Sequence, residues 1–181
     1  MAVVRPRDIL DFWFAAGKEK WWSKSDAFDA EIRKLFGDSY HAGVAGKLDD
    51  WINEPQGALA LILLLDQFSR NLYRNDHRAW EQDGKALAVA REAIARRFDV
   101  EIPLTARNWV YMPFMHSEDM AVQEESLGYF GRLGDPEIMK FAEEHADIIR
   151  RFGRFPHRNE VLGRVSSEAE RDFLASGGFK G

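Results

Sequence analysis

Cysteine is absent from this chain of 181 residues, which excludes disulfides, thiolate metal sites and cysteine nucleophiles. Long apolar runs are absent too. The longest covers residues 58–65, whereas a membrane-spanning helix needs about 20 apolar residues. The first residues also lack the basic start, apolar core and small-residue cleavage site of a signal peptide. We therefore expect a soluble cytoplasmic protein that does not bind membranes.

Basic charge is not in excess. The formal net charge is −5 and the pI is about 5.6, whereas nucleic-acid-binding domains are normally basic, so we expect no nucleic-acid partner. The composition, 45% apolar and 30% charged, is typical of a globular protein, and the length suits one domain over residues 1–181. A P-loop, a dinucleotide-binding glycine motif and a GxSxG motif are all missing, so we expect no cofactor.

Strand patterns are also missing, because no alternating apolar run is bounded by hairpin turns. The sequence predicts an all-α fold of antiparallel helical hairpins joined by short turns. Apolar spacing and capping residues predict the following helices: 7–14, 25 or 26 to 36, 38–48, 56–74, 76–98, a helix from Pro103 that kinks or breaks near Pro113, 117–133, 136 to 151 or 152, and 168–174.

An arginine-rich stretch covers residues 150–164. It holds five arginines, one glutamate and no lysine, although lysine would serve equally well on a merely solvated surface. Arginine alone favours planar, two-pronged contacts to a carboxylate or phosphate, or to the protein's own acidic side chains. His157 and Asn159 add two further groups that can bond an anion. We interpret this stretch as the rim or floor of a polar site.

A second polar group ends the helix predicted over residues 56–74. Asp66 and Arg70 are four residues apart, and Asn71 and Arg74 lie in an adjacent row. This turn of helix therefore offers a carboxylate, two guanidinium groups and an amide to a ligand. The alternative is a solvated Asp66–Arg70 pair, which would stabilise the helix by only a few tenths of a kcal/mol.

The third group is the sequence MPFMHSED, residues 112–119. Pro113 should disrupt the helix just before His116 and Glu118, and a broken helix can place a histidine at the mouth of a cleft. The alternative is that Ser117 caps a new helix whose first turn is complemented by Glu118 and Asp119. That alternative accounts for the acidic residues and leaves His116 unexplained.

His145 lies on an apolar helical stripe with Phe141, Ile148 and Phe152. It is either a core histidine bonded to a carbonyl or a part of the same cleft as the arginine-rich stretch. His116, Glu118, His145 and His157 are potential ligands of a divalent ion. Because there is no HExxH pair and arginine is abundant, we expect no metal site.

The motifs DQFSRNLYR, YMPFMHSED and FGRFPHRNEVLGRVSSEAERDFL resemble those of a bacterial family of uncharacterised proteins. The resemblance runs from Ile9 to Leu174. The family pattern has proline where this chain has Ser69, and Ser-Thr where it has Ser166-Ser167. The resemblance implies an all-α fold grouped with tetratricopeptide-like helical hairpins, and it implies no activity. The family's polar signature falls on these residues: Asp66, Gln67, Arg70, Asn71, Arg74, His116, Glu118, His145, Arg154, His157, Arg158, Asn159 and Arg164.

Three functions fit these residues. The first is a groove that binds a small anionic molecule, with arginines such as Arg70, Arg74, Arg154 and Arg158 holding the charge and with His116 and His157 as acid–base groups. The second is a tetratricopeptide-like interaction module that grips acidic peptides. The third is a purely structural network of arginines and acids. We favour the first, and whether the protein is an enzyme stays open.

Overall fold

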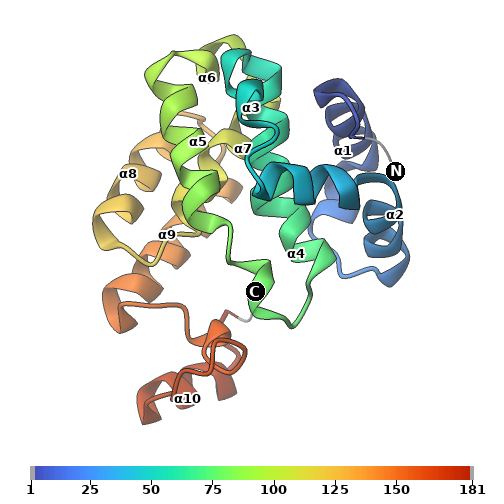
Figure 1. Cartoon of the computed structure of the whole chain (residues 1–181). Helices are drawn as coiled ribbons and strands as arrows, with labels where there is room; N and C mark the ends of the chain where they lie inside the picture. The colour runs from blue at the N-terminus through green and yellow to red at the C-terminus, as the bar shows by residue number, and fades with distance from the viewer. Residues whose placement is uncertain (1–2, 180–181) are drawn as a thin grey trace. The chain divides into compact units, whose positions relative to one another are not determined.

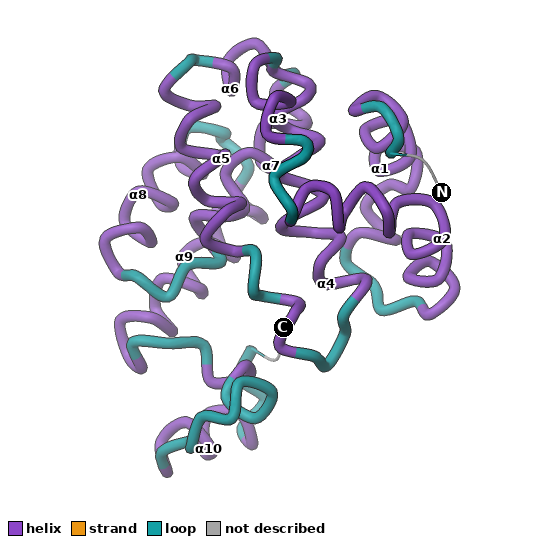
Figure 2. The backbone as a smooth tube through the Cα atoms, viewed as in Figure 1, coloured by secondary structure: helices purple, strands orange, loops and turns teal. Residues whose placement is uncertain are grey.

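The computed structural model describes residues 3–179, most of which lie in helices (Figure 1). Across these residues no strand is found, as the helix and loop colouring of Figure 2 shows, which confirms the all-α prediction. The chain forms two compact units. The first unit is the chain up to Arg74 together with Arg78–Pro113, and the second is Asn75–His77 together with the residues from Phe114 onward.

The first unit is built around one long apolar helical rod. The elements up to its end are α1 (Pro6–Trp21), α2 (Asp26–Val44), η1 (Asp49–Asn53), α3 (Pro55–Ile62), η2 (Leu63–Phe68), α4 (Ser69–Leu72), η3 (His77–Ala79, shared with the second unit), α5 (Asp83–Ala95), α6 (Phe98–Glu101) and α7 (Leu104–Met115). The rod is α3, η2 and α4, and α1, α2 and α5 pack against it. All residues from Gly57 to Ser69 are buried, so this rod is the centre of the core.

The helices of the first unit differ from the predictions in several places. The helix predicted over 76–98 is shorter and covers Asp83–Ala95, which is α5. α1 extends to Trp21 but is interrupted at Gly17, whose φ of 75° and ψ of 173° are not helical, so the first helical segment closes there as expected. The two helices predicted over 25–36 and 38–48 are one helix, α2, which Ser25 caps by accepting a hydrogen bond from the Phe28 amide. Gly43 does not break α2, because its open face packs against Leu61 and Leu65.

The rod contains a π-helical segment. The rod begins at Pro55, as predicted. After α3 the helix widens into the π-helix η2 over Leu63–Phe68, and α4 then continues as an α-helix. π-helical segments inside α-helices are rare and occur frequently at functional sites. This one holds the predicted site residue Asp66, whose side chain is fully buried.

The second unit starts in the last turn of α7 and contains α8 (Met120–Gly131), α9 (Pro136–Phe152), η4 (Pro156–Arg158) and α10 (Glu168–Ala175). α8 and α9 form a helical hairpin across a short turn at residues 132–135, where Asp135 caps α9. Gly153 ends α9 in the left-handed conformation, at a φ of 68°. η4 then packs against α10, whose N-terminus is capped by Ser167.

The break predicted near Pro113 falls just after Met115. α7 runs through Pro113 to Met115, because Met112, Phe114 and Met115 are all buried and hold the last turn in place. The next helix begins at Met120, and its cap is Asp119, not Ser117. Ser117 instead accepts a hydrogen bond from the Asp119 amide. The tetratricopeptide-like grouping and the single domain stay predictions, and residues 1–2 and 180–181 of that domain lie outside the described range.

Candidate functional site

The predicted site residues fall in both units and form separate clusters within them. The first unit holds Asp66, Arg70, Asn71 and Arg74, and the second holds His116, Glu118, His145, Arg154, His157, Arg158, Asn159 and Arg164.

In the first unit, Arg70 joins two acidic residues. Its guanidinium donates hydrogen bonds of 3.0 and 3.1 Å to the Asp83 carboxylate, and it lies 3.5 Å from an oxygen of Asp66. Gln67 donates to the other Asp66 oxygen at 2.6 Å. Burial lowers the pKa of Arg70, but the charges of Asp83 and Asp66 outweigh it and the net pKa is raised. Because Asp66 is fully buried and Arg70 is partly buried, this pair is not the solvated pair of the alternative.

The other two predicted residues of the first unit converge on Asp29. Asn71 donates to Asp29 at 2.8 Å, and Arg74 forms a two-pronged pair with the same carboxylate, one arm of it at 2.9 Å. Asp29 is buried in the first turn of α2. The sequence did not point to Asp29, because an acidic residue in a first helical turn is ordinarily read as a complement to the helix dipole.

In the second unit, Glu118 joins the loop after α7 to the arginine-rich stretch. Arg164 donates to its two oxygens at 2.6 and 2.9 Å, and the Phe155 amide donates at 2.8 Å. Burial raises the pKa of Glu118, but these hydrogen bonds and the charges of Arg158 and Arg164 lower it more, so the net pKa lies below its ordinary value. The alternative placed Glu118 in the first turn of a helix, but Glu118 lies before that helix begins.

Glu170 binds Arg154, near the start of the same arginine-rich stretch. Arg154 donates to it at 2.6 and 2.8 Å, and the Ser167 amide donates at 2.7 Å. The hydrogen bonds from Arg154 lead the effects that lower the pKa of Glu170 to about 2. Sequence reasoning missed Glu170, although the spacing of Ser167 and Glu170 is the S-x-x-E signature of a capping box. The neighbouring Asn159 is fully buried and donates to Ser166 at 3.1 Å.

The expectation of a set of ligand-binding arginines therefore needs revision. Arg70, Arg74, Arg154 and Arg164 each have a carboxylate partner inside their own unit. Arg158 contacts a backbone carbonyl and an aromatic ring. It is 6% exposed, donates to the carbonyl oxygen of His116 at 3.0 Å, and its guanidinium carbon lies 4.5 Å from the centre of the Phe155 ring.

The three predicted histidines of the second unit lie close to one another, two of them against the Phe155 ring. The centres of the His145 and His157 rings lie 5.4 and 5.7 Å from the centre of the Phe155 ring, and the His116 ring lies 6.3 Å from that of His145. We call these three histidines, with Phe155 and Arg158, the histidine cluster. Its members come from the loop after α7, from α9 and from the segment around η4.

His145 satisfies the core-histidine interpretation as well. It is 6% exposed, and its Nδ1 lies 2.8 Å from the Phe141 carbonyl oxygen one turn earlier in α9. That bond fixes the orientation of the ring, whose edge faces Phe155. His116 and His157 are only partly buried. The cluster thus has one firmly held histidine and two that solvent reaches.

Metal ligation finds no support in the geometry. Over residues 3–179, no three or more His, Cys, Asp or Glu side chains are grouped so as to hold a metal ion. The histidines of the cluster face aromatic rings and a guanidinium, and Glu118 is held by Arg164.

Comparison with known proteins gives the family. Residues 9–178 match the model of a family described as bacterial proteins of unknown function, DUF924. The chain belongs to this family. A solved structure, that of the protein of unknown function ATU0120 from Agrobacterium tumefaciens, is 40% identical in sequence, with a TM-score of 0.92, over 95% of this chain and 97% of that one. Among curated proteins no match is found.

These comparisons confirm the resemblance drawn from the motifs and assign no activity to the DUF924 family. Each helix in the described part of the chain is too short or too polar to cross a membrane.

Proposed function

We propose that this DUF924 protein is a cytoplasmic protein that binds a small anionic ligand at the histidine cluster of its second unit. The proposal rests on the grouping of three histidines from three segments: His145 and His157 both contact the Phe155 ring, and His116 contacts His145. Histidine and arginine side chains are costly to bury unless they are hydrogen-bonded or paired, and here two of the histidines are only partly buried, within reach of a ligand.

Arg158 supplies the positive charge for the ligand in this proposal. It is held over Phe155 and against the His116 backbone, so its position is set before a ligand arrives. A charge-assisted hydrogen bond from such a guanidinium to a carboxylate or phosphate is about twice as strong as one between neutral groups. His116 and His157 flank it, and because imidazole is the side chain most often used as a general acid or base, we assign these two histidines the acid–base role toward the bound ligand.

Two ion pairs hold the loop of the cluster in place and leave ligand binding to the cluster itself. Arg154–Glu170 and Arg164–Glu118 fasten the two ends of the loop that carries His157 and Arg158. They have the geometry expected of the structural network, and we assign them the role of holding the cluster in shape. The interaction module that grips acidic peptides remains the competing proposal, and its ligand would need a longer surface than this cluster offers.

A thermal-shift series tests the proposed site. Inorganic phosphate, acetate, succinate and benzoate are added at matched ionic strength to the wild type and to His116→Gln, His157→Gln and His77→Gln. A probe at about 100 times its dissociation constant stabilises the folded state by about 2.7 kcal/mol. We expect at least one probe to raise the melting temperature of the wild type and of His77→Gln, and to lose most of that effect in the other two variants.

His77 is the matched control because its side chain is 57% exposed and pairs with Asp76. Equal shifts in all four proteins would show that the probe acts elsewhere and would overturn the proposal. Uniformly absent shifts across the panel would overturn it as well, and would favour the interaction module or the structural network.

A further inference from the structure

The segment beyond α10 places an aromatic ring against the histidine cluster. The centre of the Phe179 ring lies 4.6 Å from that of His145 and 5.2 Å from that of His157, with interplanar angles of 61° and 76°. Both are edge-to-face arrangements, which aromatic rings prefer to direct overlap. His145, Phe155 and His157 thus form the sides of a ring site, and Phe179 is its occupant.

The sides of this ring site are better held than its occupant. Phe155 is fully buried in the apolar cluster with Ile148 and Ile149, and His145 is fixed by its bond to the Phe141 carbonyl. Phe179 is only partly buried. It is the last residue of a turn, residues 176–179. Among the described residues, the last backbone hydrogen bond joins the Gly178 amide to the Phe173 carbonyl oxygen at 2.9 Å.

Two glycines determine the path of the 176–179 turn. Gly177 has a φ of 88°, a conformation that other residues rarely adopt. A Cβ atom on Gly178 would lie 2.6 Å from the Phe173 ring and also 2.6 Å from the Phe173 carbonyl oxygen. Any side chain at position 178 would therefore push the turn away from Phe173, and Phe179 with it.

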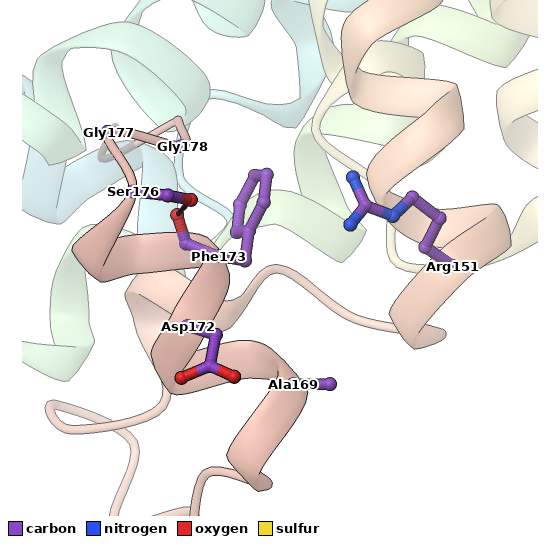
Figure 3. A pocket seen from close by; sticks show the side chains of 7 residues that line it. All are labelled: Arg151, Ala169, Asp172, Phe173, Ser176, Gly177 and Gly178. Carbon is purple, nitrogen blue, oxygen red and sulfur yellow. Dashed lines mark hydrogen bonds between the residues drawn. The ribbon is translucent and has the colours of Figure 1, made fainter.

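An open groove runs beside the 176–179 turn, so the turn has room to move. It is lined by Arg151, Ala169, Asp172, Phe173, Ser176, Gly177 and Gly178 and has a volume of about 650 Å³ (Figure 3). Figure 3 shows the Arg151 side chain of α9 facing the Phe173 ring of α10 across this groove, at 5.3 Å from the ring centre. Solvent reaches the turn here, and the turn is not enclosed by packed side chains.

From these contacts we infer that the ring site binds the aromatic group of an external ligand, and that Phe179 occupies the same place when the ligand is absent. The inference rests on the proposed function. It specifies the ligand as an aromatic anion. Its ring would lie between His145 and His157, and its charged group would point toward Arg158, whose guanidinium also contacts the Phe155 ring. The 176–179 turn is then a lid that the ligand displaces.

The test compares three carboxylates of the same charge. Benzoate carries a flat ring, cyclohexanecarboxylate carries a ring of similar size that is not aromatic, and acetate carries none. Their dissociation constants are measured by titration calorimetry or NMR for the wild type, Phe179→Ala, Gly178→Ala and Phe141→Ala. Phe141→Ala is the matched control, because Phe141 is 54% exposed and lies outside the ring site.

The lid model predicts a selective gain. If Phe179 fills the ring site in about nine molecules of ten, its removal strengthens the apparent binding of benzoate about tenfold, since only the competent fraction binds. Gly178→Ala should do the same while keeping Phe179. Acetate should bind equally to all four proteins, and cyclohexanecarboxylate should gain less than benzoate. Phe141→Ala should behave as the wild type does.

Two outcomes would overturn the inference, and they differ in what they imply. Benzoate binding that is unchanged in Phe179→Ala and Gly178→Ala, or no tighter than that of cyclohexanecarboxylate, would reject the ring site and the lid while leaving the anion site in place. An absence of binding for all three carboxylates in all four proteins would reject the anion site too.

Discussion

At the scale of the residue, the arginines of this chain are explained first by their acidic partners. Glu118 shows the pattern, since it accepts hydrogen bonds from Arg164 and from the Phe155 amide and so joins two segments that are far apart in sequence. The absence of lysine from residues 150–164 indicated two-pronged contacts to a ligand or to the protein's own acids, and Arg154 and Arg164 make such contacts to Glu170 and Glu118. Which carboxylates they were was not visible, because pairing over such separations depends on the tertiary fold.

Glu118→Gln should destabilise the protein. The substitution keeps the shape of the side chain but removes the charge that Arg164 and Arg158 face, and hydrogen bonds to charged groups contribute about 1.5–3 kcal/mol each. We expect a fall of about 2 kcal/mol in the free energy of unfolding measured with urea. Asp147→Asn is the control, because Asp147 forms only exposed pairs with Arg150 and Arg151 and should cost less than about 0.5 kcal/mol. Equal losses in the two variants would contradict the account.

Acid should weaken the second unit through Glu170 and Glu118. Both have a folded-state pKa below the ordinary value of 4.5, that of Glu170 at about 2. The unfolded state therefore takes up protons first as the pH falls, so their contribution to stability is complete above about pH 4.5 and is lost toward pH 2. In urea midpoints recorded against pH, Glu170→Gln should show a smaller decline across this window than the wild type. An identical decline would refute the role of Glu170.

At the scale of the element, helix existence was predictable and helix boundaries were less so. The helix 168–174 was predicted almost to its end, because Ser167 carries a local capping signal. The division of α2 was wrong because Gly37, which lies at the predicted boundary, is inside the helix, although local propensity disfavours glycine there. The π-helical segment around Asp66 was also beyond reach, since a single extra residue per turn changes the apolar spacing too little to be recognised.

Gly57 provides a test of the packing around the rod. A Cβ atom at this position of α3 would lie 2.2 Å from the Trp51 carbonyl oxygen of η1, a backbone atom that cannot rotate away. Gly57→Ala should therefore cost about 1–3 kcal/mol through overpacking, despite the better helix propensity of alanine. Gly84→Ala in α5 is the matched control, because nothing lies within 4 Å of its Cβ position, and it should be neutral or stabilising by up to about 1 kcal/mol. Chemical denaturation measures both, and a neutral Gly57→Ala would contradict the packing described for α3 and η1.

At the scale of the whole molecule, the two units carry different parts of the predicted site. The motif around Asp66 belongs to the first unit, and the motifs around His116 and the arginine-rich stretch belong to the second. The chain's membership of the DUF924 family was predictable, because the motifs are long. The role of Phe179 was not, since an isolated phenylalanine beyond the last helix has no pattern that links it to histidines 22 and 34 positions earlier.

The central claim is that His116, His145 and His157 form one ligand site, and histidine-ring NMR tests it most directly. The chain has five histidines, so each imidazole can be assigned in a long-range proton–nitrogen spectrum. During a benzoate titration, the account predicts that the signals of the three cluster histidines move together with one dissociation constant, while those of His41 and His77 stay in place. Shifts spread over all five rings, or none at the cluster, would contradict it.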